Sequence, residues 1–158
     1  MPYDTNNNPY YVAKIPDLKR VTDDILVLCT DYKYKDLYGI ERIIARGFIN
    51  DGATRPKFLE FFIQKDSLNN GAFLKHDYNY WHQFCTRVEA DRLLLIDLLR
   101  NPNNPVQWCY TVYYTLRCMG WKSWSDNTKI KKAMGLRNRY MVEADIVEIE
   151  ARIKIDDE

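Results

Sequence analysis

The chain has 158 residues, 14% of them aromatic, and its 23 basic and 22 acidic residues give a formal net charge of +1. This length is enough for one domain whose core needs no disulfide staples. The near-neutral charge excludes a polycation that binds nucleic acid through its overall charge. No apolar run approaches the roughly 20 residues of a membrane-spanning helix, and the chain does not open with a secretion signal. We therefore expect a single domain over residues 1–158 with no membrane span.

The first ten residues are polar and rich in asparagine, which predicts a flexible or partner-binding arm. Twelve tyrosines and four tryptophans are typical of interfaces, because these side chains combine a large contact area with a polar group. They favour contacts with other macromolecules, further copies of this chain included. The four cysteines lack a CxxC spacing and lie in apolar contexts, so we expect them to be reduced and buried. They are Cys29, Cys85, Cys109 and Cys118.

Two stretches in the first third of the chain have the pattern of β-strands. Residues 24–34 join an apolar run to alternating tyrosine and lysine, and residues 40–48 form the predicted partner. Residues 36–39 supply the turn between them. This region is predicted to be an antiparallel hairpin or a small sheet.

Beyond Pro56 the pattern becomes helical. Thr86 followed by Glu89 is the signature of a capping box, so a helix is expected to begin at residue 87. Pro105 is placed to start another helix, and Gly120 is placed to end it. Residues 121–125 are expected to form a turn. The predicted helices span residues 71–84, 87–99, 106–120 and 129–150. The predicted fold class is α+β, with an N-terminal antiparallel β-hairpin or small sheet packed on a bundle of about four helices.

One of the two histidines stands among carboxylates. His76 and Asp77 lie on one predicted helix and Asp91 lies on the next. Helices joined by a short turn pack side by side, so His76 can meet Asp91. A carboxylate in that position fixes the imidazole tautomer and stabilises its protonated form. A histidine held in this way can act as a general base on water, which makes His76 and Asp91 candidate catalytic residues.

Asp77 points about 100° away from His76 around the helix. It can therefore face a cation or the glycine-containing loop at residues 47–52. Calcium binds carboxylate and backbone carbonyl oxygens, and such a loop can turn its carbonyls inward. Asp77 and Asp51 are thus candidate ligands, with calcium as the candidate metal.

The same residues also fit a purely structural role. A buried histidine bonded to an aspartate can simply tie two helices together, and Arg92 can complete a structural ion pair. Asp51 can cap the turn at Gly52. The residues assigned to this polar network or loop are Gly52, Thr54, Arg92 and Tyr80. The residues alone leave the catalytic and the structural interpretation open.

Three motifs resemble the signature of the phage-encoded family known as domain of unknown function 1353, across roughly residues 40–120. They are Gly47-Phe48-x-x-Asp51-Gly52-Ala53-Thr54-x-Pro56, His76-Asp77-x-x-Tyr80 and Ala90-Asp91-Arg92. The resemblance implies a bacteriophage or prophage product of the kind often found among virion structural genes. We therefore expect a virion-associated structural protein of the tail, neck or host-entry apparatus. It would be made in the host cytoplasm, be located in the virion and contact other virion proteins.

The His76-Asp77-x-x-Tyr80 motif followed by Asp91 is also similar to the active-site helices of the small secreted calcium-dependent phospholipases. That resemblance implies that His76 is the base, Asp77 the calcium ligand and Asp91 the residue that orients His76. The sequence departs from that family at residues 72–73, which replace flanking cysteines, and in a loop with fewer glycines. The alternative function is a hydrolase with a His-Asp dyad, calcium-dependent in this reading, that acts on a host envelope component.

A third alternative comes from basic residues interleaved with aromatic ones between Trp121 and Arg139. Such a stretch can bind single-stranded nucleic acid by stacking and phosphate contacts. A solvated helix face beside core tryptophans has the same composition, and the acidic segment 143–150 can neutralise it. Nucleic-acid binding is the least favoured of the three functions.

Overall fold

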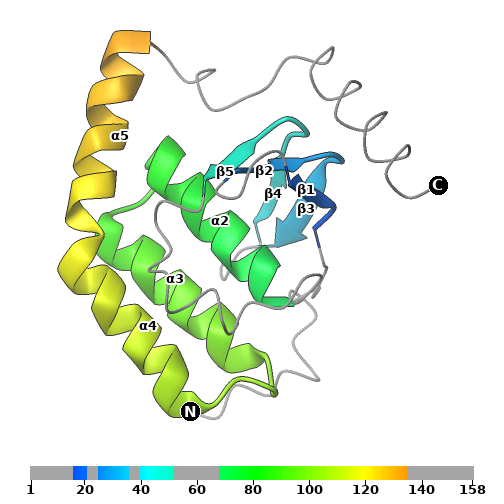
Figure 1. The fold of residues 1–158 in the computed structure, drawn as a ribbon, viewed down its shortest axis with the longest axis vertical. Helices are drawn as coiled ribbons and strands as arrows, with labels where there is room; N and C mark the ends of the chain where they lie inside the picture. The colour runs from blue at the N-terminus through cyan, green and yellow to red at the C-terminus, as the bar shows by residue number, and fades with distance from the viewer. Residues whose placement is uncertain (1–15, 21–24, 36–39, 52–67, 135–158) are drawn as a thin grey trace.

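The computed structural model describes residues 16–20, 25–35, 40–51 and 68–134, in which small antiparallel sheets precede four packed helices (Figure 1). The strands are β1 (Leu18–Arg20), β2 (Ile25–Leu28), β3 (Tyr32–Lys35), β4 (Glu41–Ile44) and β5 (Ile49–Asp51). The helices are α2 (Leu68–His82), α3 (Arg87–Arg100), α4 (Val106–Met119) and α5 (Trp121–Met134). The predicted α+β class is confirmed. The predicted arm at residues 1–10 lies outside the described residues.

The strands β2 to β5 form one long antiparallel hairpin with an interruption. Ile25 faces Asp51 in the β2–β5 pair, and Lys35 faces Glu41 in the β3–β4 pair, so both pairs share one register. At the interruption the N–H of Leu28 donates to the carbonyl of Phe48 and the N–H of Gly47 donates to the carbonyl of Leu28. Leu28 therefore faces both Gly47 and Phe48, as in a β-bulge, and Gly47 has the positive φ of 91° that glycine adopts readily. Residues 29–31 then stand opposite residues 45–46 only, which restores the common register.

The observed strands differ from the predicted ones because of this bulge. The stretch expected as one strand, residues 24–34, contains two strands, and its partner continues past residue 48 into β5. β1 adds a third strand that pairs antiparallel with β2, with Leu18 facing Leu28. The predicted hairpin is thus present, and a bend divides it into a three-stranded and a two-stranded sheet.

The starts of α3 and α4 and the end of α4 agree with the sequence signals, whereas both ends of α2 and the start of α5 do not. Thr86 caps α3 with the complete capping box to Glu89, and Pro105 is the N-cap of α4. α2 starts three residues earlier than predicted and ends at His82, because Gln83 takes a left-handed φ of 56°. The turn predicted at residues 121–125 is wrong. Gly120 has right-handed helical angles, φ −72° and ψ −12°, and its carbonyl accepts from Trp124 N–H, so α5 begins at once.

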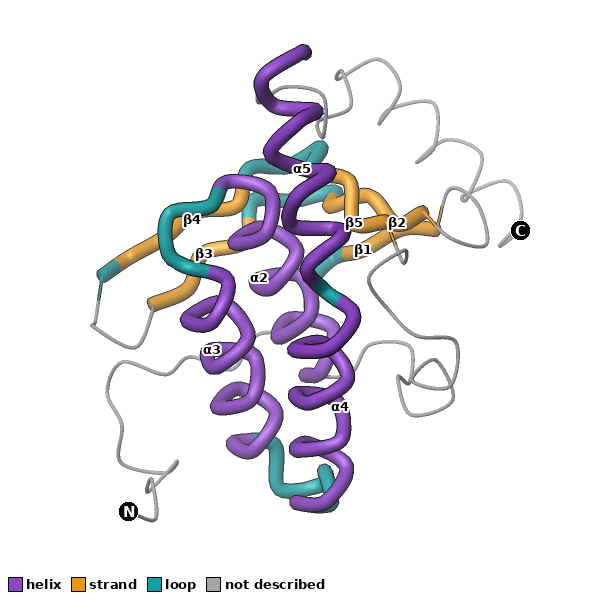
Figure 2. The backbone as a smooth tube through the Cα atoms, turned by 90° about the vertical axis from the view of Figure 1, so that its left-hand side faces the viewer, coloured by secondary structure: helices purple, strands orange, loops and turns teal. Residues whose placement is uncertain are grey.

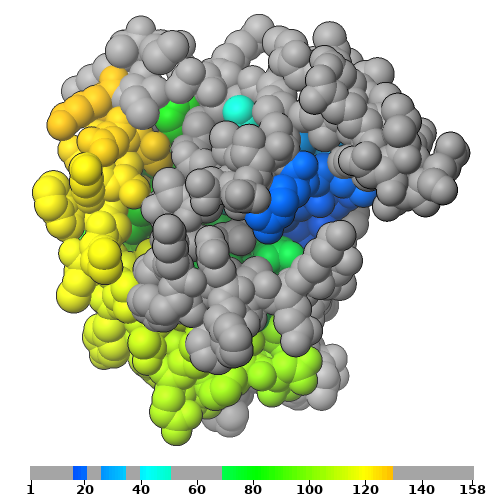
Figure 3. Space-filling view, viewed as in Figure 1, coloured from blue at the N-terminus to red at the C-terminus, as the bar shows by residue number. Residues whose placement is uncertain are grey.

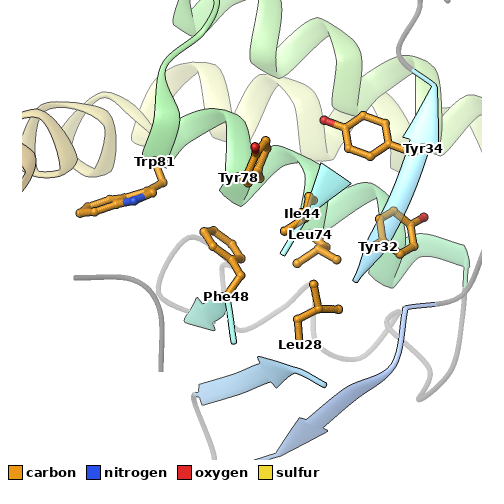
Figure 4. Close-up of a cluster of buried hydrophobic side chains, with 8 residues drawn as sticks. All are labelled: Leu28, Tyr32, Tyr34, Ile44, Phe48, Leu74, Tyr78 and Trp81. Atoms are coloured by element: carbon orange, nitrogen blue, oxygen red, sulfur yellow. The ribbon is translucent and has the colours of Figure 1, made fainter. Parts of the chain in front are cut away.

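α2 lies between the strands and the helices α3 and α4 (Figure 2). One of its sides meets the hairpin in a cluster of buried side chains (Figure 4). These are Leu28, Tyr32, Tyr34, Ile44, Phe48, Leu74, Tyr78 and Trp81. The other side packs on the helices through Ala72, Phe73, Leu94, Leu98, Cys109, Val112 and Leu116. Because α2 is covered on both sides, polar residues along it are removed from water.

None of the four cysteines takes part in a disulfide. Cys29 and Cys109 are buried as predicted, whereas Cys118 is exposed and Cys85 is half-buried. Cys118 is exposed because it lies on the outer side of α4, three turns along from Gln107 and Val106, which are exposed as well. Among the described helices, none combines the length and the apolar character that a membrane span requires.

Candidate functional site

The centre of the candidate site is Asp91, whose side chain is fully buried. The capping box at Thr86 starts α3, and Asp91 follows in its second turn. Asp91, Leu94 and Leu98 repeat at intervals of three and four residues, which places them on one face of a helix. That face is the one buried in the protein, so the carboxylate enters the core together with the two leucines.

α2 supplies two partners for one oxygen of this carboxylate. The Nε2 of His76 lies 2.9 Å from Oδ1 of Asp91, and the hydroxyl of Tyr80 donates to the same atom at 2.6 Å. His76 and Tyr80 are four residues apart, so their side chains are neighbours on the helix and their ring centroids lie 4.2 Å apart. His76 is 2% exposed and Tyr80 is 1% exposed. The predicted contact between His76 and Asp91 is therefore present.

Two arginines bind the other oxygen. Nη1 of Arg117, from α4, donates to Oδ2 of Asp91 at 2.7 Å, and Nη1 of Arg87 lies 3.5 Å from the same atom. Arg87 also donates to the carbonyl oxygens of Leu116 and Arg117. Those carbonyls end α4, where the helix dipole favours a cation. Asp91 thus connects α2, α3 and α4.

The charges in this cluster agree with an ionised Asp91. Burial raises the pKa of its carboxyl, but hydrogen bonds from His76, Tyr80 and Arg117 and the charge of His76 outweigh it, so the net pKa is lowered. Burial, the hydrogen bond to Asp91 and its negative charge raise the pKa of Tyr80 well above its ordinary value. The hydrogen bond to Asp91 raises the pKa of Arg117. An ionised carboxylate only accepts hydrogen bonds, so a neutral His76 carries its proton on Nε2.

Gly120 explains how Tyr80 reaches Asp91. A Cβ atom at Gly120 would lie 2.6 Å from the hydroxyl oxygen of Tyr80 and 2.6 Å from the carbonyl oxygen of Leu116. Only a residue without a side chain fits there. On its other side, the Tyr80 ring meets Trp124 of α5 edge to face, with 5.2 Å between the ring centroids. The junction of α4 and α5 therefore fixes the phenol.

The remaining predicted residues have different surroundings. Asp77 is on α2 and is 4% exposed. Arg92 is exposed, and its positive charge contributes, after the hydrogen bonds of Thr86, to lowering the pKa of Glu89. Asp51 ends β5, and its side chain lies outside the described part of the structure. The predicted network residues Gly52 and Thr54 also lie outside it.

The residues predicted to bind calcium lie only partly within the described part of the structure. Across residues 16–20, 25–35, 40–51 and 68–134, no three histidine, cysteine, aspartate or glutamate side chains gather closely enough to hold a metal ion. Of the two carboxylates predicted as ligands, only Asp77 has a described side chain. Calcium takes six to eight oxygens, and with Asp51 not described the calcium site stays a prediction.

Three members of the cluster were not predicted from the sequence: Arg87, Arg117 and Gly120. Arg87 has a local signal, because it precedes Asp91 by four residues on one helix and can pair with it. Arg117 has none, because 26 residues separate it from Asp91. Gly120 was expected to end α4 and does so, but glycine is required at this position because Tyr80 lies so close.

Residues 26–115 match the model of a family described as "Protein of unknown function (DUF1353)". This segment covers more than half of the chain and runs from β2 into α4. It includes His76, Tyr80 and Asp91, whereas Arg117 lies two residues beyond it. No curated protein and no solved structure matches the chain.

Proposed function

Since the chain belongs to the DUF1353 family, whose function is unknown, we propose from its own geometry that it is a hydrolase with His76 as general base. The observation that carries this proposal is the 2.9 Å contact between Nε2 of His76 and the fully buried carboxylate of Asp91. This contact leaves Nδ1 as the basic nitrogen of the neutral ring.

The burial of α2 supports a site with a chemical role. Its residues 76–80 are His, Asp, Tyr, Asn and Tyr, and each is at most 9% exposed. Burying ionisable groups costs several kcal/mol of desolvation free energy, and apolar residues of similar volume often stabilise a core better. Clusters of buried ionisable groups are accordingly more frequent at functional sites. A structural network that joins α2, α3 and α4 would be buried in the same way, so the hydrolysis assay has to distinguish the two roles.

The proposed reaction is the hydrolysis of an ester in a host envelope component. Nδ1 of His76 takes a proton from water while the water oxygen attacks the carbonyl carbon of the ester. Asp91 stabilises the imidazolium that forms. The C–O bond to the leaving group then breaks, and His76 returns the proton to the leaving oxygen. The products are an acid and an alcohol, and the histidine regains its neutral form.

The test measures the release of fatty acid from phosphatidylglycerol vesicles, with calcium or with a chelator. We expect His76→Gln to lower the rate by about 100-fold or more, the usual contribution of a general base. His82→Gln is the matched control, because His82 is on the same helix and is the only other histidine. Thermal unfolding of each variant shows that it is folded. Unchanged hydrolysis by folded His76→Gln, or no hydrolysis by the unaltered protein, contradicts the proposal. Dependence on calcium would support the calcium reading of the site.

The second candidate is a structural role in the virion, which the surface of α4 and the start of α5 favours (Figure 3). Large apolar side chains are exposed there: Val106 at 58%, Tyr110 at 42%, Tyr114 at 61%, Met119 at 64% and Trp121 at 61%. Arg117 is the single charged residue in α4, and it is bound to Asp91. Uncharged surfaces rich in tyrosine and tryptophan are typical of the centres of protein interfaces.

This candidate predicts that the protein is retained in purified phage particles, where an antibody would detect it. Tyr114→Ser combined with Trp121→Ser should remove it from the particles and leave its thermal unfolding unchanged. Absence of the unaltered protein from the particles contradicts this candidate. Nucleic-acid binding is the third candidate: of the two tryptophans in its stretch, Trp121 is exposed, whereas Trp124 is half-buried and packs edge to face on Tyr80.

A further inference from the structure

The two oxygens of Asp91 have separate partners. Oδ1 accepts from His76 and Tyr80, both on α2, and Oδ2 binds Arg117 and Arg87. Because the arginines bind Oδ2, Oδ1 remains available to His76 and Tyr80. They also fix the rotation of the carboxylate about its Cβ–Cγ bond, because each oxygen is held from a different helix.

The arginines also set the direction of the hydrogen bond to His76. A buried carboxylate without a cation tends to hold a proton, and a protonated Asp91 could donate to Nε2 instead of accepting from it. The proton of a neutral His76 would then be on Nδ1, and the basic nitrogen would face Asp91. The titratable and charged groups that hydrogen-bond to Asp91 or pair with it are His76 and Tyr80 of α2, Arg87 of α3 and Arg117 of α4.

Of the two arginines, Arg117 has the stronger contact with Asp91. Its Nη1 is 2.7 Å from Oδ2, whereas Nη1 of Arg87 is 3.5 Å from the same atom. Arg87 also donates hydrogen bonds to the carbonyls at the end of α4. We propose that Arg117 is a positioning residue: it keeps Asp91 a hydrogen-bond acceptor, so that Nδ1 of His76 remains the free basic nitrogen. A role of Arg117 in catalysis rests on the proposed function, whereas its effect on the tautomer of His76 does not.

The test observes the imidazole directly. Two-bond ¹H–¹⁵N NMR spectra of the full chain distinguish a ring that is protonated on Nε2 from one protonated on Nδ1. They are recorded at a pH at which the ring is neutral. The chain has two histidines, and the spectrum of His82→Gln assigns the signals of His76. We expect the Nε2–H form in the unaltered protein, a loss of its dominance in Arg117→Met and its recovery in Arg117→Lys, which restores the cation. Arg92→Met is the matched control, because Arg92 is an exposed arginine next to Asp91 in sequence.

Two results would overturn the proposal. One is an Nδ1–H form of His76 in the unaltered protein, a result that does not depend on whether the Arg117 variants fold. The other is an unchanged Nε2–H ring in folded Arg117→Met. If Arg117→Met does not fold, Arg117→Gln, which retains part of the side chain and a donor, takes its place in the comparison. If neither folds, Arg117 is essential for the fold and its assignment as a positioning residue is withdrawn.

The hydrolysis assay separates this inference from the proposed function. If the protein hydrolyses esters, Arg117→Met should lower kcat by about 10- to 100-fold, the range found when a group that orients a ligand histidine is removed. Arg117→Lys should restore most of the rate. If the unaltered protein hydrolyses nothing yet shows the expected tautomers, the proposed function fails while the role of Arg117 towards His76 stands.

Discussion

α2 carries two polar clusters of different character, one at its start and one in its second half. Near its start, the side-chain amides of Asn69, Asn101 and Asn104 bond one another at 2.8–3.0 Å, and Asn104 also donates to the carbonyl of Leu98. Further along, His76 and Tyr80 meet the ionised cluster of Asp91 and the arginines. Both clusters join α2 to α3 and to residues beyond it.

The difference lies in what each cluster costs and what it can do. Neutral amides lose little on burial when their hydrogen bonds are made, so the asparagine cluster is an economical link between α2 and the loop before α4. A buried carboxylate loses far more hydration and needs all its partners. The ionised cluster is therefore a poor choice for a mere link, and its retention in the core supports a chemical role. The following predictions test whether the two clusters differ in this way.

The largest effect is expected from Asp91→Ala. Removal of the carboxylate leaves two arginines, an imidazole and a phenol without their common acceptor, which should lower the free energy of unfolding by about 3–5 kcal/mol. Urea denaturation measures it. Arg92→Ala, at an exposed position on the same helix, should stay within about 0.5 kcal/mol of the unaltered protein. A loss of less than about 1 kcal/mol for Asp91→Ala would mean that the cluster is dispensable for folding.

Asn69→Ala should have a smaller effect. It removes the acceptor of the Asn101 and Asn104 amides, and unsatisfied buried donors cost about 1–3 kcal/mol. The control is Asn103→Ala, because the exposed Asn103 bonds Asn101 through its backbone N–H, which the substitution keeps. Hydrolysis should be unaffected in both. A loss of stability as large as that of Asp91→Ala would contradict the distinction between the clusters.

Gly120→Ala tests whether the close approach of Gly120 to Tyr80 stabilises the ionised cluster. The new methyl group would lie 2.6 Å from the Tyr80 hydroxyl oxygen and 2.6 Å from a backbone carbonyl, so one of them must shift. Such overpacking typically costs about 1–3 kcal/mol. Met119→Ala, at a residue that is 64% exposed, is the control in the same thermal unfolding experiment. Equal stability of the two variants would show that Tyr80 is free to move away from Gly120.

Acid should affect the ionised cluster and spare the amides. The folded pKa of Asp91 is lowered, so this group contributes stability above its unfolded pKa, and the contribution is lost as the pH falls through the lower folded value. The free energy of unfolding should therefore decrease below about pH 4. Asn69→Ala should keep this acid dependence, whereas Asp91→Asn should weaken it. Identical acid dependence in Asp91→Asn would contradict the assignment.

Alkali provides the smallest expected effect. The raised pKa of Tyr80 means that its contribution is complete below the ordinary tyrosine value and is lost as the pH rises through the folded value. Above about pH 10 the unaltered protein should lose stability more steeply than Tyr80→Phe. Denaturation curves between pH 8 and pH 11 would measure the two slopes. Parallel slopes would show that the Tyr80 hydroxyl contributes nothing to this dependence.

Local patterns predicted much of the architecture. The capping box of Thr86 and Glu89 placed α3, Pro105 placed α4, and apolar alternation placed the hairpin, because each signal acts within a few residues. The contact of His76 with Asp91 was also predictable, since a connection of a few residues forces α2 and α3 to lie side by side. The bulge at Gly47 and the immediate start of α5 at Trp121 were not, because both depend on hydrogen bonds to neighbouring segments.

The amino-acid sequence was sufficient to establish the α+β class, the order of its elements and the pairing of a histidine with a carboxylate on the next helix. These properties follow from periodicity, caps and short connections. The charge state and the environment of that pair depend on Arg117 and on Gly120 beneath Tyr80, which lie 26 and 29 residues beyond Asp91 along the chain. No local pattern links residues at such separations, since only the packing of α4 against α2 and α3 brings their side chains to one carboxylate.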